Sequence, residues 1–483
     1  MRPSSIRCPL VALLLAGLLA GCAQDRAVAS GSRGARSGLA PRNSFDAPSA
    51  PPDLSFDGSP DLVLLLETAL TRSPLIRAAQ ARANAALEGA TVEGALPNPQ
   101  LLVGWYETSV ETRVGSQEWS VGVRQAIPFP TKLDARADIE ISESKRMRIA
   151  YERAARDVLV EVVKVAHEIA YIDQALAVSA EIAALLERYT VAAAGQDTSS
   201  LVSELFRAET QRAQLDNDRV TLAELRVVEA QRMRSLLDLS PETPIGTPTL
   251  SAVPQVRSSV AELLRVAEIH NQELREAGIS LETARLRTSL AEQRHLPDLS
   301  VGVTSIRTDR LSSSLGVNPK GNGADPLIVQ LGVTLPIWLQ KDAAAIRRAR
   351  LLERAASLQR MDAIQKTRDR VARAWFQVGN AQRLSRLYDE VLIPRAAVAA
   401  RTAEDLLAST KGTLGGVLET IAVYHNFRLA GARARADHGR AIAELERAIG
   451  QPFEALPAPA SAPAPAPAPA PELAGESNTG EQR

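Results

Sequence analysis

The sequence predicts a mainly α-helical protein with a small β part, in which one unit of helix, β-hairpin and long helical pair occurs twice. The first observation is that residues 132–194 contain neither Pro nor Gly. The second is a short run of alternating apolar and polar residues ahead of each long helical stretch. The third is the dipeptide Leu96-Pro97, which returns as Leu296-Pro297 two hundred positions later. That period is too long for a solenoid repeat and indicates a duplicated domain.

The first repeat is expected over about residues 61–240. A helix runs from Asp61 to about Ala95, two strands cover about 99–128, and long helices cover about 132–238. In the second strand, Trp119, Val121 and Val123 alternate with Ser120, Gly122 and Arg124. In the first long helix, apolar residues recur at steps of four and three, as in a coiled coil. They are Val158, Val162, Val165, Ile169, Ile172 and Leu176.

A Pro-rich linker over residues 241–257 leads to the second repeat, over about residues 258–450. A helix is expected from Ser258 to about His295, strands over about 298–336, and long helices over about 341–450. The β alternation returns, since Val329, Leu331 and Val333 alternate with Gln330, Gly332 and Thr334. The tips of the two helical pairs are expected at residues 195–200 and 411–412.

Residues 1–21 have the pattern of a signal peptide, a basic start followed by the short apolar run Leu10–Leu19. The sequence Leu19-Ala20-Gly21-Cys22 resembles a bacterial lipobox. It predicts a lipoprotein that begins at Cys22 and carries fatty acyl chains, such as palmitate, on that residue. An ordinary signal peptide with an incidental Cys is the alternative. Residue Ala23 is not the Asp associated with inner-membrane retention, which favours the outer membrane.

Residues 22–60 are rich in Ser, Gly, Ala and Pro and are expected to form a flexible tether. Residues 451–483 are dominated by alternating Pro and Ala and are expected to form a disordered tail. The 56 Lys and Arg residues balance the 56 Asp and Glu residues, so that net charge gives no argument for a nucleic-acid partner.

Catalytic and cofactor sites are not expected. His167-Glu168 opens a His-Glu-x-x-Tyr sequence, which lacks the second His of a zinc protease. The other His residues are scattered without a Cys partner, which argues against a metal site. No Gly-rich phosphate loop follows a strand. The chain is therefore predicted not to be an enzyme. Since it has no phosphate loop with which to use ATP, any energy that its function requires must come from a partner protein.

The strands are the expected membrane-crossing elements, because no stretch after the signal peptide has eighteen consecutive apolar residues. About ten alternating residues suffice for a tilted membrane strand. Trp105, Trp119 and Trp338 stand within or at the ends of strands, as in an interfacial aromatic belt. Four strands cannot close a barrel that spans a bilayer, so that three copies with twelve strands are expected. A soluble sheet with protected edges is the alternative.

Four segments together resemble the outer membrane efflux proteins typified by the trimeric TolC channel, including lipoprotein members of drug and heavy-metal efflux systems. They are Leu96-Pro97-Asn98-Pro99, Gln125-Ala126-Ile127-Pro128, Ile393-Pro394-Arg395-Ala396 and the stretch 443–450. The resemblance covers nearly all of residues 61–450. It implies a trimeric twelve-stranded outer membrane barrel that continues into a periplasmic α-helical barrel, with a small equatorial region.

The family closes its periplasmic entrance with polar and acidic side chains near the second tip. Val417-Leu418-Glu419 resembles the family's Val-Leu-Asp there, so Glu419 is the first gate candidate. Gly415-Gly416 stands where the pattern has another Asp, which makes Glu404 and Asp405 further candidates. These acids could instead be ordinary solvated helix positions. The adaptor is expected to dock at the tips, at Gly195, Gln196, Asp197, Lys411 and Gly412.

The predicted function is a passive, lipid-anchored outer membrane duct of a tripartite efflux system, working with a periplasmic adaptor and an inner-membrane transporter of the resistance-nodulation-division (RND) type. A type I peptide or protein secretion channel and a structural periplasmic coiled-coil lipoprotein are the alternatives. A periplasmic adaptor would need lipoyl-like and β-barrel domains that this sequence lacks. Drugs, metal ions and secreted peptides all remain possible substrates.

Overall fold

The computed structural model of the chain describes residues 56, 58–193, 199–250, 253–311, 319–409 and 413–453, with side chains omitted at 189–190, 192–193 and 199–205. The signal peptide, Cys22, most of the tether, and the tip residues Gly195, Gln196, Asp197, Lys411 and Gly412 lie outside these residues, as does the tail from residue 454 onward. The described residues belong to one compact unit.

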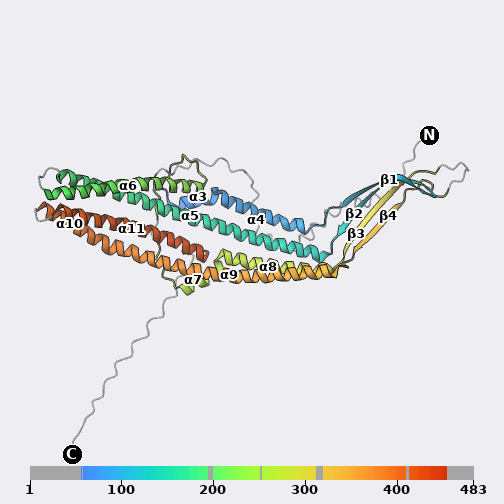
Figure 1. Ribbon diagram of the computed structural model, residues 1–483. Coiled ribbons are helices and arrows are strands. Elements are labelled where there is room, and N and C mark those ends of the chain that lie inside the picture. The colour runs from blue at the N-terminus through green and yellow to red at the C-terminus, as the bar shows by residue number, and fades with distance from the viewer. Residues whose placement is uncertain are drawn as a thin grey trace, which may run out of the picture. The chain divides into compact units, whose positions relative to one another are not determined.

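The same order of elements occurs in both halves of the chain (Figure 1). The first half contains α3 (Leu62–Arg72), α4 (Pro74–Glu93), β1 (Gln100–Thr112), β2 (Gly115–Ile127), α5 (Pro130–Ala193) and α6 (Ser199–Leu237). The second half contains α7 (Val260–His270), α8 (Gln272–Glu292), the 3₁₀ turn η1 (Gln293–His295), β3 (Asp298–Thr308), β4 (Leu327–Thr334), α9 (Leu339–Arg386), the π-helix η2 (Leu387–Leu392), α10 (Ile393–Ala408) and α11 (Leu414–Ile449).

The single helix expected ahead of each hairpin is wrong in both halves, because each is two helices. Ser73 has ψ of 121° and separates α3 from α4. It precedes Pro74, whose ring disfavours helical backbone at the preceding residue. In the second half, Asn271 has ψ of 122°, and its side chain accepts a hydrogen bond from the Leu274 amide. The Asn271 side chain also donates to the Ala448 carbonyl of α11 at 2.8 Å, which fixes the break against the helical core.

A π-helical turn interrupts the long helix of the second half at Leu387–Leu392. Pro394 follows two residues after this turn and lacks the amide hydrogen that a regular helix uses. A π-turn shifts the hydrogen-bond register locally and accommodates this loss. The opposing helix, α11, has a glycine at this position. A Cβ on Gly431 would lie 2.8 Å from Cδ1 of Ile393.

The four strands form one antiparallel sheet in the order β1-β2-β3-β4. The two hairpins are therefore joined by the pairing of β2 with β3, in which Val123 lies opposite Val303 and Ile127 opposite Leu299. This pairing connects the two halves of the chain, and the sheet lies at one end of the helices (Figure 1).

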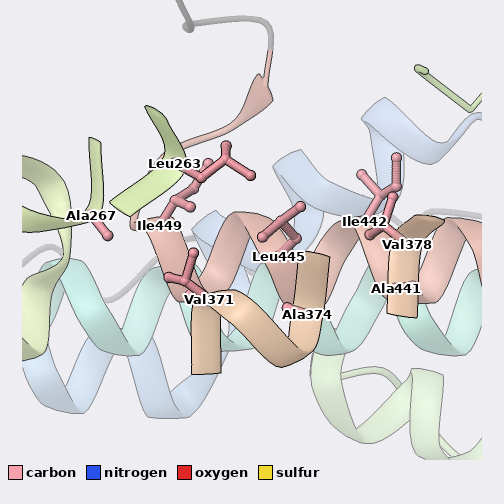
Figure 2. Packing of buried hydrophobic residues seen from close by; sticks show 10 residues of the cluster. Leu263, Ala267, Val371, Ala374, Val378, Ala441, Ile442, Leu445 and Ile449 are labelled. Atoms are coloured by element: carbon pink, nitrogen blue, oxygen red, sulfur yellow. The ribbon is translucent and has the colours of Figure 1, made fainter. Parts of the chain in front are cut away.

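Long helices pack around α5, which contacts α3, α4, α6, α8 and α11. At about 1.5 Å per residue its 64 residues extend for roughly 96 Å. One buried cluster joins α7, α9 and α11 (Figure 2). In it, Leu445 and Ile449 of α11 pack in one cluster with Leu263 of α7 and Val371 of α9, and all four side chains are fully buried. A second cluster joins α5, α6 and α11 near the tips.

Within the described residues, one helix, Pro130–Arg188, contains a window long and apolar enough to cross a membrane. The same apolar residues form the coiled-coil seam of α5. Val162, Val165, Ile169 and Ile172 have no exposed surface, because neighbouring helices cover them. The hydropathy of this helix is thus accounted for by packing against protein.

Candidate functional site

One face of the sheet is apolar and uncovered. Paired residues on neighbouring strands share a face, and Leu101, Val123, Val303 and Val329 form one row across all four strands. On this face Leu101 is 69% exposed and Leu331 is 80% exposed. Other exposed apolar residues of the face are Val103, Trp105, Trp119, Leu299, Val301, Leu327 and Val333. An apolar surface of this extent marks a lipid or protein contact.

The opposite face is built mainly from small and polar residues. Gly104 lies against Ser120, Gly122 against Thr304, and Gly332 against Ser300. A Cβ on Gly122 would lie 2.4 Å from Oγ1 of Thr304, so that the glycine leaves room for this hydroxyl. Leu102, Ile306 and Ile328 are the apolar exceptions. The two faces thus differ in the way that a wall between lipid and water requires.

Both outer edges of the sheet are open among the described residues, since β1 pairs only with β2 and β4 pairs only with β3. These edges present unpaired backbone amides and carbonyls over strands of 13 and 8 residues. Unpaired edges are not tolerated in lipid and invite pairing with another chain.

The three tryptophans expected at the membrane interface lie toward the two ends of the sheet. Trp105 pairs in register with Trp119 near the β1–β2 turn. Trp338 follows β4 at the start of α9, where Ile337 and Leu339 are also exposed. From Trp119 to Ile127 the strand advances by roughly 26 Å, at about 3.3 Å per residue. That length is close to the apolar band of outer-membrane barrels, about 25 Å.

The sheet and helices meet at a polar clamp between the two halves of the chain. The Lys132 ammonium donates to Oδ1 of Asp298 at 2.9 Å and to the Leu296 carbonyl at 2.7 Å. The Phe129 amide also donates to Oδ1 of Asp298, at 3.0 Å. The start of α5 is thereby fixed to the start of β3.

The three gate candidates lie near the described end of α10 and the start of α11. Thr413 caps α11 by accepting a hydrogen bond from the Gly416 amide, and Val417 and Leu418 are buried against α5 and α6. Glu419, next along the helix, is exposed, as is Asp405, whereas Glu404 is half-buried. Among the described residues, none of the three carboxylates is ion-paired within the protomer.

The sequence did not indicate the contact at which α5 crosses α11. The His167 ring packs on Gly439, where an added Cβ would lie 2.1 Å from Cε1 of the imidazole. Burial, together with the nearby His438 and Arg440, lowers the pKa of His167 to about 4. His438 lies beside it, and its Nε2 atom is buried without a hydrogen-bond partner. The pattern of glycine spacing offered no signal for this contact.

A cavity of about 380 Å³ adjoins this crossing and is lined in part by His167, Tyr171, Arg435 and His438. Next to it, Glu168 accepts from Arg433 at 2.8 Å and from Arg440 at 2.6 Å. Within the part of the chain that the structure describes, no three His, Cys, Asp or Glu side chains are grouped so as to hold a metal ion.

Comparison with known proteins gives a family match to the second half of the chain and a fold for most of it. Residues 263–451 match the family model of the outer membrane efflux proteins. A search of the curated proteins found no match. The open MtrE outer membrane channel of Neisseria gonorrhoeae is similar in structure, with 17% identity and a TM-score of 0.67, over 81% of this chain and 89% of that one.

Two further solved structures have the same architecture. The outer membrane protein VceC of Vibrio cholerae shows 18% identity and a TM-score of 0.62, over 81% of this chain and 97% of that one. The CmeC outer membrane channel of Campylobacter jejuni shows 13% identity and a TM-score of 0.63, over 80% and 85%. Residues 263–451 therefore match the outer membrane efflux protein family by sequence, and the described chain has the fold of the solved outer membrane channels.

Proposed function

We propose that the chain is the passive outer membrane duct of a tripartite efflux system and that it works as a homotrimer. The observation that carries the proposal is an uncovered apolar sheet face between two open edges, at one end of a set of long helices, of which α5 extends for roughly 96 Å. Pairing β1 of one copy with β4 of the next would close a twelve-stranded barrel and remove every edge from lipid. The long helices would continue as a periplasmic barrel.

The proposed anchor and partners follow from the ends of the molecule. Acylation of Cys22 would fix the chain to the outer membrane, alongside the lipids that contact the apolar face. A periplasmic adaptor would dock at the tips, around Gly195, Gln196, Asp197, Lys411 and Gly412. An inner-membrane transporter, of the RND type, would supply the energy.

Glu419, Glu404 and Asp405 are proposed to narrow the periplasmic end. Three copies of an acidic residue around one axis would form a ring that favours cations and repels anions. Exchange of Glu419 for Gln should raise the chloride share of the current through the purified channel, while Glu209→Gln on the exposed surface of α6 serves as the matched control. An equal chloride share of the current in Glu419→Gln and Glu209→Gln would show that Glu419 is not part of the gate.

Two experiments test the function. Purified protein should migrate as a trimer after cross-linking in detergent and should conduct ions in planar bilayers. A deletion strain should become sensitive to exported compounds and should be restored by the wild-type gene, with Cys22→Ala less effective. Sensitivity to metals would indicate metal efflux, and sensitivity to drugs would indicate multidrug efflux. Loss of a secreted peptide would indicate a type I secretion channel. A monomer without conductance would refute the proposal.

A further inference from the structure

Arg124 is a charged residue on the small-residue face of the sheet, three residues before the end of β2 at Ile127. In register it lies opposite Gln100 of β1 and Gly302 of β3, and Gly302 lies opposite Gln330 of β4. This row therefore contains two amides, one glycine and one guanidinium. The side chain of Arg124 is exposed.

The side of the sheet from which the Arg124 side chain projects follows from the backbone around Gly302. A Cβ built on Gly302 would lie 3.8 Å from Cβ of Arg124 and 3.6 Å from Oε1 of Gln330. All three therefore lie on the same side of the sheet. The next row toward the β1–β2 turn, with Val123 and Val303, points to the other side, where the exposed apolar residues lie.

The charge of Asp298 on the same face is neutralised. Asp298 starts β3 and is paired with Lys132 at 2.9 Å. Over the regularly paired parts of the four strands that the structure describes, Arg124 is the charge on this face without an ion-pair partner. An unpaired guanidinium keeps its charge at every physiological pH and is strongly disfavoured in lipid.

We propose that Arg124 sets the charge preference of the membrane section by forming a ring of three guanidinium groups inside the barrel. The inference rests on the proposed trimeric channel, in which the apolar face contacts lipid and the small-residue face lines water. Rings of Arg favour anions in aqueous pores. The membrane section therefore selects for anionic solutes and against cations, whereas the proposed acidic gate acts in the opposite sense at the other end.

The test is the reversal potential of single trimers in planar bilayers under a KCl gradient, with the wild type and Arg124→Lys, Arg124→Gln and Arg124→Glu. Three charges about 10 Å from an axis in water change the chloride-to-potassium permeability ratio about three- to ten-fold near 10 mM salt, and little near 1 M. The expected order of that ratio is wild type equal to Arg124→Lys, then Arg124→Gln, then Arg124→Glu. The differences should shrink as salt rises.

Arg113→Gln is the matched control, because it removes the same charge in the β1–β2 turn, about eleven residues away along the strand. At roughly 3.3 Å per residue this distance is about 36 Å and exceeds the screening length of about 30 Å near 10 mM salt, and the permeability ratio should stay at the wild-type value. Conducting variants with one common permeability ratio would overturn the role of Arg124 and leave the channel intact. A wild type that does not conduct would overturn the channel itself. If Arg124→Glu fails to form trimers, the permeability ratio of Arg124→Gln alone tests the proposal.

Discussion

Lys132 at the start of α5 and Asp298 at the start of β3 join the two halves of the chain through one ion pair of 2.9 Å. The lysine side chain is 10% exposed and also donates to the Leu296 carbonyl. This clamp lies where the sheet becomes helix, so it couples the direction of the strands to the direction of the longest helix.

Replacement of Lys132 by Met should destabilise the protein by about 1–3 kcal/mol, because the Leu296 carbonyl and the Asp298 carboxylate both lose a donor at a partly buried site. The free energy of unfolding, measured by denaturant titration in detergent with circular dichroism, checks this value. Lys145→Met is the control, since Lys145 is an exposed lysine of the same helix and its loss should cost less than about 0.5 kcal/mol. Equal effects at both positions would show that the clamp adds nothing.

Much of this fold follows from sequence periodicity, because the helices and strands use patterns that are local. The Pro- and Gly-free stretch predicts α5, and the alternation around Val121 predicts β2. The breaks at Ser73 and Asn271 were missed, since apolar spacing continues across them. The break at Ser73 could have been predicted from Pro74, which follows it. The break at Asn271 depends on its bond to Ala448, 177 positions away, which local patterns do not reveal.

The candidate site was less predictable than the fold. Which strands pair is a long-range property, and the pairing of β2 with β3 was not expected. The alternation of apolar and polar residues assigns Arg124 to the polar face of its strand. That Arg124 has no ion-pair partner on this face could be recognised only once the register of all four strands was known. The function of Glu419 depends on other copies of the chain, so that neither the sequence nor one protomer determines it.

The crossing of α5 and α11 should not tolerate a side chain at Gly439. Gly439→Ala should destabilise by about 1–3 kcal/mol although alanine favours helix, because the methyl group overlaps the buried His167 ring. Gly278→Ala in α8 is the matched control: nothing lies within 4 Å of its added Cβ, and helix propensity predicts a gain of about 0.5–1 kcal/mol. Thermal unfolding of both variants separates packing from propensity.

A double-mutant cycle with His167→Ala identifies the cause. Removal of the ring makes room for the methyl group, so the cost of Gly439→Ala should fall by at least half in that background. An unchanged cost would mean that the clash lies in the backbone of α5 and not in the imidazole.

The buried His167 makes stability depend on pH. Its pKa of about 4 in the folded chain lies below the value of 6.5 expected when unfolded, so the unfolded state binds the proton more tightly. The contribution is fully present above pH 6.5 and is lost as pH falls toward 4, by about 3 kcal/mol in total. Unfolding free energies at intervals from pH 7 to pH 4 should therefore fall more steeply for the wild type than for His167→Gln. Parallel curves would contradict the assignment to this residue.

Two glutamates of α5 allow a comparison of a largely buried carboxylate with an exposed one in the same protein. Glu168 is 13% exposed and binds Arg433 and Arg440 of α11, whereas Glu181 is 61% exposed and binds Arg428 of the same helix. Glu168→Gln should cost about 2 kcal/mol or more, because two guanidinium groups keep their charge near a site that has lost its own. Glu181→Gln should cost less than about 1 kcal/mol, because water solvates both partners.

Denaturant titrations at low and at 1 M salt distinguish the two cases, since screening should reduce the Glu181 effect and leave most of the Glu168 effect. A Glu168 effect that disappears at high salt would mean that water reaches this crossing, and the packing of α5 on α11 would then be looser than the His167–Gly439 contact requires.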